Sequence, residues 1–221
     1  MASDNAERAN EILRILKNNF EAPEPWGIAG DPFKVLVRTI ISQSTAEANT
    51  RRAYLNLSRK TSINPTSLVE AEETEIEDAL RVAGLYRNKS RNLKKVAELV
   101  LEKFNGSLSF IFTSPMEESR AELMSLPGVG PKTADIVLLF SAGKPTLPVD
   151  THVNRVSKRL KLVPQNGGYE TVRETLHKLY PSKEYFDVHM LFIALGRKYC
   201  KALKPLHSAC PVRELCPSAE P

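Results

Sequence analysis

Cysteine, tryptophan and long apolar runs are scarce in this chain of 221 residues. Its three cysteines all lie in the last 22 residues, which excludes the distributed disulfide framework of a small secreted protein. No run of 18 apolar residues occurs, so no segment is long enough to cross a membrane as a helix. The acidic and amphipathic N-terminal segment is typical of a folded helix and not of a signal peptide. We therefore expect an intracellular protein without membrane contact.

The alternation typical of β-strands is also absent, as are repeats and low-complexity segments, and apolar residues recur at helical spacing instead. In the stretch 6–20, for example, Ala9, Ile12 and Leu16 would share one helical face. The same criterion predicts helices over 32–42, 45–60, 67–82, 89–104, 117–125, 131–140, 149–160, 168–180 and 185–200. A connector rich in proline and glycine occupies 21–30. The chain is therefore predicted to be all-α, with one large or two small domains.

The most informative segment is Leu126-Pro127-Gly128-Val129-Gly130-Pro131-Lys132. Gly128 and Gly130 can adopt positive φ, so the chain can turn tightly and another backbone can approach it closely. Pro131 suits the first turn of a helix, where its missing N–H costs nothing. The exposed N–H groups of such a hairpin, at the positive end of a helix, form an anion site that suits a nucleic-acid phosphate. A net charge of +5 modestly favours the same kind of partner. An ordinary loop between two helices is the structural alternative.

Eighteen residues after Lys132, Asp150 stands directly before Thr151 and His152. An aspartate at this place is a good N-cap for the helix that follows, which is the structural alternative to any chemical role. The presence of the glycine hairpin, the lysine, the aspartate and the C-terminal cysteines in this order makes a chemical role the better interpretation.

Taken together, LPGVGPKTAD and PVDTHVNRV resemble the helix-hairpin-helix DNA glycosylases that carry a Gly/Pro-rich loop and an aspartate, and above all their endonuclease III branch. The resemblance covers about residues 31–216. It implies a two-lobed all-α fold in which 1–24 and 146–221 form a lobe with a cysteine-rich loop, and 25–145 form a six-helix barrel with the hairpin. It also implies a monomer, cytoplasmic or nucleoid-associated, whose partner is double-stranded DNA with a damaged base.

The resemblance makes Lys132 the nucleophile and Asp150 the essential carboxylate. Chemistry agrees with both roles. A carboxylate stabilises the positive charge that develops on a sugar whose base departs, and a neutral lysine amine that attacks C1′ forms a Schiff base, which permits β-elimination. A dry or cationic surrounding would keep that amine neutral. The structural alternative for Lys132 is a surface lysine or a phosphate contact.

Two further segments gain a meaning from the family. Gln43 resembles the glutamine that fills the gap left by a flipped base, and Leu85 resembles the apolar residue that unstacks the opposite strand. Gly128, Val129 and Gly130 would complete the DNA contacts. The structural alternatives are that residues 42–45 cap the next helix, and that Leu85 anchors the core after a helix end at Gly84.

Other polar residues near these motifs are less telling. Arg87, Lys89 and Arg91 either bind phosphate or form a solvated face. The helical spacing of Arg155, Lys158 and Arg159 likewise favours DNA and water about equally. His152 is expected to be a structural residue, and no role is assigned to Asp187 and His189.

The C-terminal segment departs from the family. Relatives carry C-x6-C-x2-C-x5-C and bind a [4Fe-4S] cluster, whereas this chain has Cys200, His207, Cys210 and Cys216, with histidine at the second position. The resemblance favours a [4Fe-4S] cluster, either with His207 as fourth ligand or as a labile three-cysteine form. Zinc bound by three cysteines and one histidine is chemically sound, and a segment without metal is the third alternative.

The sequence therefore predicts a base-excision repair DNA glycosylase with abasic-site lyase activity, which removes oxidised pyrimidines through a Lys132 Schiff base. A monofunctional glycosylase acting on mismatched thymine or uracil is one alternative, and Lys132 speaks against it. A non-catalytic DNA-binding module is the other, and the combination of Lys132 with Asp150 speaks against that.

Overall fold

The computed structural model describes residues 2–21 and 29–220, and within them every regular element is a helix. The chain divides into two compact units. Unit 1 combines the segment 1–24 with 145–221, and unit 2 comprises 25–144. In the described part of the chain, no helix is long and apolar enough to span a lipid bilayer.

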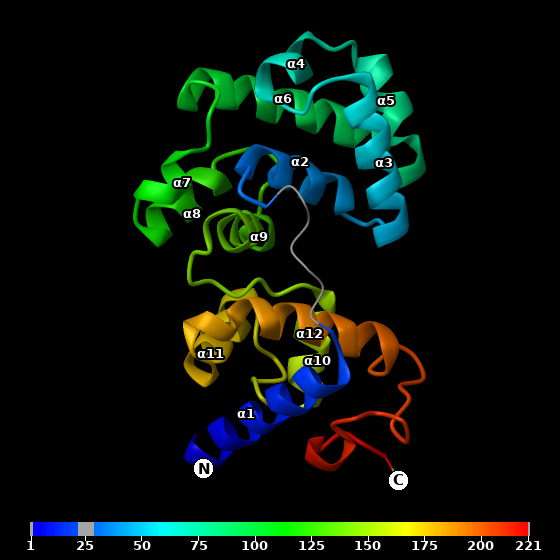
Figure 1. The fold of residues 1–221 in the computed structure, drawn as a ribbon, viewed down its shortest axis with the longest axis vertical. Helices are drawn as coiled ribbons and strands as arrows, with labels where there is room; N and C mark the ends of the chain where they lie inside the picture. Colours follow the sequence, from blue (N-terminus) through cyan, green and yellow to red (C-terminus); the bar gives the residue numbers. More distant parts are fainter. Residues whose placement is uncertain (1, 22–28, 221) are drawn as a thin grey trace. The chain divides into compact units, whose positions relative to one another are not determined.

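Unit 2 contains eight of the described helices, and six of them have eight residues or more. They are α2 (Pro32–Ser42), α3 (Glu47–Lys60), α4 (Pro65–Glu70), α5 (Glu73–Leu80), α6 (Tyr86–Phe104), α7 (Phe110–Thr113), α8 (Met116–Met124) and α9 (Pro131–Ala142), with a 3₁₀ turn η1 (Arg81–Ala83). Helices α2 and α9 lie side by side in Figure 1 and contact each other. Both are buried on nearly every side, including polar residues such as Arg38 of α2 and Asp135 of α9.

The helix predicted over 67–82 is wrong in its continuity. It is split into α4 and α5 at Ala71 and Glu72. Asn64 caps α4 by accepting a hydrogen bond from the Ser67 N–H at 2.9 Å. Lys94 Nζ on α6 donates to the carbonyls of Val69 and Ala71, and these bonds hold the chain in the turn between the two helices. Helical spacing alone does not reveal such a break, because the apolar residues on both sides keep the same period.

Unit 1 brings the N-terminal helix α1 (Ala2–Asn19) together with three helices from the C-terminal part of the chain. These are α10 (Thr151–Arg159), α11 (Tyr169–Leu179) and α12 (Tyr185–Lys198). The 3₁₀ turn η2 (Ser182–Glu184) lies between α11 and α12, and η3 (Arg213–Leu215) follows α12 near the C-terminus. Helix α1 contacts both α11 and α12, and Figure 1 shows it beside them. Ile12 and Leu16 of α1 are fully buried in one core with Val156 and Phe192.

A buried ion pair joins the two helices that flank the glycine hairpin. Arg120 of α8 donates from Nε to Asp135 Oδ1 of α9 at 2.9 Å, and the two residues are 9% and 0% exposed. Two charges removed from water stabilise a fold only while they stay paired, because each alone carries a large desolvation penalty. The pair therefore links α8 to α9 on either side of the hairpin.

We predict that Arg120→Met lowers the free energy of unfolding by about 3–5 kcal/mol, since the buried Asp135 carboxylate loses its guanidinium partner. Denaturant titration of the variant measures the loss. The double variant Arg120→Met/Asp135→Leu should recover most of the stability, because neither charge then remains buried. Equal stability of Arg120→Met and the parent protein would contradict the role given to the pair.

Candidate functional site

The glycine hairpin connects α8 to α9 through residues 125–130. Gly128 has φ +70°, and a Cβ added to it would lie 2.2 Å from Asn92 Nδ2, so the turn needs a glycine for its conformation and for the Asn92 contact. Gly130 differs from the expectation: its φ is −92°, and a Cβ there would meet no atom within 4 Å. No side chain caps the α9 N-terminus that follows, so its first N–H groups keep the direction suited to an anion.

Gln43 lies against this hairpin. Its side chain donates from Nε2 to the Gly128 carbonyl at 3.0 Å, while its backbone forms the C-terminal cap of α2. The next residue, Ser44, has a left-handed conformation with φ +53°. The alternative that residues 42–45 cap the following helix is wrong. The N-cap of α3 is Ala46, and no side chain accepts a capping hydrogen bond from the first N–H groups of α3.

Leu85 is exposed on the same unit. It is 62% exposed and has φ +47°, and it follows Gly84 with φ +65°. The alternative that Leu85 anchors the core is therefore wrong. A leucine in the left-handed region is strained, and an exposed apolar side chain gains nothing from burial to offset that strain. Such a residue indicates a function outside the isolated fold.

A pocket of about 270 Å³ lies between Gln43 and Leu85. It is lined by Ile40, Gln43, Ser44, Leu85, Asn88, Lys89 and Asn92. The expectation that Lys89 meets phosphate or solvent is wrong, because Lys89 is only 4% exposed. Arg87 and Arg91 are exposed as expected and lie near Glu77 and Glu73 of α5, at 3.9 and 3.3 Å. The hairpin, Gln43 and Leu85 thus belong to one connected region of unit 2.

Lys132 and Asp150 occupy well-defined backbone positions in different units. Lys132 is half-buried in the first turn of α9, directly after Pro131, and the residues that follow it in the helix are buried. Asp150 is the N-cap of α10 and accepts a hydrogen bond from the Val153 N–H at 2.7 Å. The capping role expected as the alternative for Asp150 is present, and one of its oxygens is thereby fixed by the backbone.

The segment before Asp150 is also tied down. His189 of α12 is 2% exposed, and its Nδ1 lies 2.9 Å from the Pro148 carbonyl. His152 packs directly against Gly196, and burial lowers the pKa of its imidazole. His152 is thus a packing residue, as expected. His189 holds the backbone at Pro148, two residues before Asp150. Asp187 pairs with Lys17 of α1 at 2.8 Å and helps to hold α1 on α12.

The basic residues of α10 serve the fold. Arg155 donates to the carbonyls of Cys200 and Gly196 at 2.9 and 3.0 Å, and Lys158 donates to Gly167 O at 2.9 Å. Arg159 donates to the carbonyls of Lys201 and Ala202 at 2.6 and 3.0 Å. Hydrogen bonding to the protein's own backbone was not among the roles expected from the sequence. Arg155 and Arg159 thereby bind carbonyls of residues 196–202, where α12 ends and the irregular C-terminal segment begins, while Lys158 binds the loop before α11.

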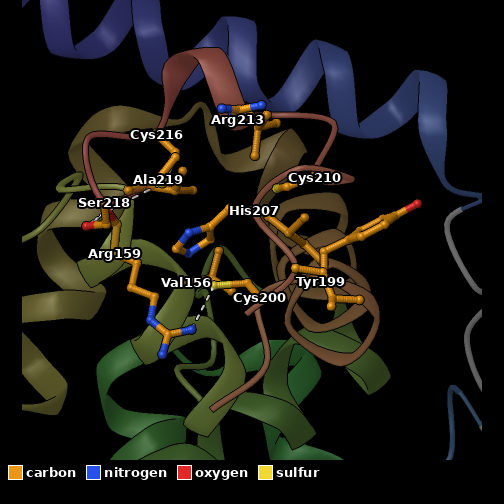
Figure 2. A pocket seen from close by; sticks show the side chains of 14 residues that line it. Val156, Arg159, Tyr199, Cys200, His207, Cys210, Arg213, Cys216, Ser218 and Ala219 are labelled. Carbon is orange, nitrogen blue, oxygen red and sulfur yellow. Dashed lines mark hydrogen bonds between the residues drawn. The ribbon is translucent and has the colours of Figure 1, made fainter. Parts of the chain in front are cut away.

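Three half-buried cysteines and one histidine line a cavity at the end of that segment. Figure 2 shows Cys200, Cys210 and Cys216 spaced around the imidazole of His207. Arg159 donates to Cys200 Sγ at 3.4 Å, and burial raises the pKa of the Cys210 thiol. The Glu220 N–H donates to His207 Nδ1 at 2.9 Å, so the neutral ring carries its own proton on Nε2.

Within residues 2–21 and 29–220, no three His, Cys, Asp or Glu side chains form a group that would hold a single ion. Four ligands of one zinc ion all lie about 2.0–2.3 Å from it, so they crowd together. The three thiols and His207 nevertheless line the same cavity.

Comparison with known proteins places these features in context. The sequence model described as HhH-GPD superfamily base excision DNA repair protein matches residues 37–182. Endonuclease III of Thermotoga maritima is 34% identical over 210 residues, which cover 95% of this chain and 91% of that protein. Endonuclease III of Escherichia coli K12 is 32% identical, with 96% of each chain covered. The solved structure of a trapped endonuclease III–DNA covalent intermediate, an estranged-adenine complex, has a TM-score of 0.85, 33% identity, and coverage of 97% and 96% of the two chains.

Proposed function

The chain belongs to the HhH-GPD superfamily of base excision DNA repair proteins, and on that premise we propose that it is a bifunctional DNA glycosylase and abasic-site lyase for oxidised pyrimidines. The observation that carries the proposal is Lys132 in the first turn of α9, immediately after the uncapped hairpin. A phosphate bound by the hairpin N–H groups would bring the adjoining deoxyribose toward that helix end.

The proposed chemistry begins with the Lys132 amine. Its nitrogen bonds to C1′ as the bond between C1′ and the damaged base breaks, and the base leaves with the bonding electrons. The Asp150 carboxylate stabilises the positive charge on the sugar and takes the proton that the amine loses. The sugar ring then opens: the bond between C1′ and O4′ breaks, O4′ takes up a proton, and C1′ and the lysine nitrogen form an imine. The imine makes the C2′ protons acidic, so loss of one of them breaks the bond between C3′ and its oxygen and nicks the strand. Water then releases Lys132 from the imine.

Three features of unit 2 support a DNA-bound role. Gly130 has no conformational reason to be glycine, and the open space beside it admits another backbone. Gln43 presents an amide that pairs with a base left without its partner. Leu85 is exposed and strained, as suits an apolar side chain that enters a base step and unstacks it.

A panel of duplexes tests the proposal. The protein is mixed with duplexes that carry thymine glycol, uracil, a G:T mismatch, 8-oxoguanine or a plain abasic site, with borohydride present. We expect a covalent complex with the thymine glycol and abasic duplexes. Base release without trapping would assign a monofunctional glycosylase, and salt-sensitive binding without turnover would assign a DNA-binding module.

We also propose that Cys200, Cys210 and Cys216 hold an iron–sulfur cluster with His207 as a weak fourth ligand. The family generally carries such a cluster, and the three thiols line one cavity together with His207. His207 fits less well than a cysteine would, because ligation through Nε2 moves the ring proton to Nδ1 and breaks the bond from the Glu220 N–H. A cluster would cross-link a segment that has little core of its own. It would supply no chemical group to base excision.

The histidine therefore has a measurable consequence. We expect His207→Cys to retain iron severalfold longer than the parent protein when an iron chelator is added, because a thiolate replaces a ligand that must break a hydrogen bond. Iron and zinc content and the visible absorption of the cluster are followed with time. Faster loss of iron from His207→Cys, or one zinc ion per chain in the parent protein, would contradict the proposal.

A further inference from the structure

Lys89 is a buried cation that the proposed chemistry does not use. It lies in the first turn of α6, is 4% exposed, and all three of its N–H donors have partners. Its Nζ donates to the carbonyls of Ile41 and Ala83 at 2.8 and 3.0 Å and to Thr45 Oγ1 at 2.6 Å. Burial lowers the pKa of this amine. None of the partners is a carboxylate, so the charge is stabilised only by oriented dipoles, an arrangement that costs stability unless it serves a purpose.

The three acceptors share a position relative to the DNA-contacting residues. Ile41 and Thr45 lie two residues before and two residues after Gln43, and Ala83 lies two residues before Leu85. Thr45 Oγ1 also donates to the Ala83 carbonyl at 2.6 Å, which closes the group. A single ammonium thus ties together both ends of the Gln43 loop (41–45) and the start of the Leu85 loop (83–85).

Both loops contain backbone that needs such support. Ser44 and Leu85 are non-glycine residues in the left-handed region, with φ +53° and +47°. Residues in this region persist only where the surrounding contacts overdetermine the backbone. Lys89 supplies three of those contacts from the rigid start of α6, and the same side chain lines the pocket between Gln43 and Leu85.

We propose that Lys89 is a positioning residue that sets the separation and direction of Gln43 and Leu85, so that the two side chains enter the duplex as one rigid unit. The proposal rests on the proposed function, because it takes the insertion of Gln43 and Leu85 into DNA as given. Lys89 touches neither the sugar nor the base in this scheme and acts only through the two loops.

Helix α6 offers a matched control. Lys94 Nζ also donates to backbone carbonyls, those of Val69 and Ala71, but these belong to the turn between α4 and α5 and not to either insertion loop. Lys89→Met and Lys94→Met therefore remove the same kind of bond from the same helix. Both are expected to lower the melting temperature, so stability alone does not separate them.

Two substrates separate them. Excision of thymine glycol from an intact duplex requires insertion, whereas nicking at an abasic site in single-stranded DNA does not. We expect Lys89→Met to lower the ratio of the first rate to the second at least about tenfold, and Lys94→Met to leave the ratio unchanged. The fluorescence of 2-aminopurine placed opposite the lesion should rise with the parent protein and with Lys94→Met, and stay low with Lys89→Met. If Lys89→Met does not fold, Thr45→Val removes one member of the group and should lower the same ratio to a smaller extent.

A double-mutant comparison adds the decisive readout. In the Gln43→Ala/Leu85→Ala background, Lys89→Met should change the ratio no further, because its effect passes through those two residues. A lower ratio in that background too, or an equal loss of both activities in Lys89→Met, would overturn the positioning role. Failure of the proposed function is distinct from either result, since the parent protein would then form no borohydride-trapped complex with the single-stranded abasic substrate.

Discussion

Replacement of Lys132 by glutamine is expected to abolish the borohydride-trapped complex entirely. Glutamine has a similar length and helix propensity but no nucleophilic amine, so no imine forms and the strand is not nicked. Lys132 lies in regular helix in the first turn of α9, a conformation that glutamine adopts readily. Affinity for an abasic duplex should therefore fall by no more than the loss of one charge near phosphate allows. Gel analysis of trapped complexes and equilibrium binding at several salt concentrations measure the two effects.

The matched control is Lys95→Gln, which removes an exposed lysine from α6 and leaves the net charge equal to that of Lys132→Gln. It should trap DNA at the parent rate. If Lys132→Gln still nicks abasic DNA as fast as the parent protein, another amine is the nucleophile. If it loses affinity with a smaller salt dependence while the parent protein never traps DNA, Lys132 is a phosphate contact in a binding module.

Asp150→Asn is expected to lower the rate of base release about 10²–10³-fold, the typical cost of removing one electrostatic partner of a charged transition state. The same change should be almost silent in stability. Asp150 caps α10 through a bond from the Val153 N–H, and asparagine caps a helix about as well as aspartate does. Single-turnover excision of thymine glycol and denaturant titration measure the two quantities side by side.

Two further variants separate the cap from the carboxylate. Asp150→Ser keeps a side-chain acceptor and should match Asp150→Asn in both assays. Asp150→Ala should be equally inactive and also lose about 1 kcal/mol of stability, because the first turn of α10 then lacks its cap. Excision by Asp150→Asn at the parent rate would leave Asp150 with only the structural role.

The sequence predicted the element that carries Lys132 well, because local rules decide it. Pro131 at the first position, apolar residues through Phe140 and Gly143 in the left-handed cap define α9 without reference to the rest of the chain. Asp150 as an N-cap follows from equally local chemistry. The prediction of positive φ at the hairpin glycines is confirmed for Gly128 and wrong for Gly130, whose backbone is extended.

Features that depend on distant segments were missed or mispredicted. The spacing of Arg155 and Arg159 shows that they share a helix face, but not that this face meets the carbonyls of residues 196–202. Lys89 looked like one of several basic surface residues, since its acceptors come from residues up to 48 positions away. The pairing of Arg120 with Asp135 likewise carries no signal in spacing. The sequence does not tell whether Leu85 is exposed or buried, because a leucine after a glycine at a helix end occurs in either setting.

Unit 1 is assembled from the two ends of the chain, and this affects the order in which a ribosome can complete the protein. Helix α1 ends at Asn19, but α12, against which it packs, begins only at Tyr185. At about 5–20 residues per second, synthesis from Asn19 to Tyr185 takes on the order of ten seconds or more. Ile12 and Leu16 of α1 stay unburied during that time, in which all residues of unit 2 are made. The apolar face of α1 is therefore buried only after α12 has been synthesised, later than any helix of unit 2.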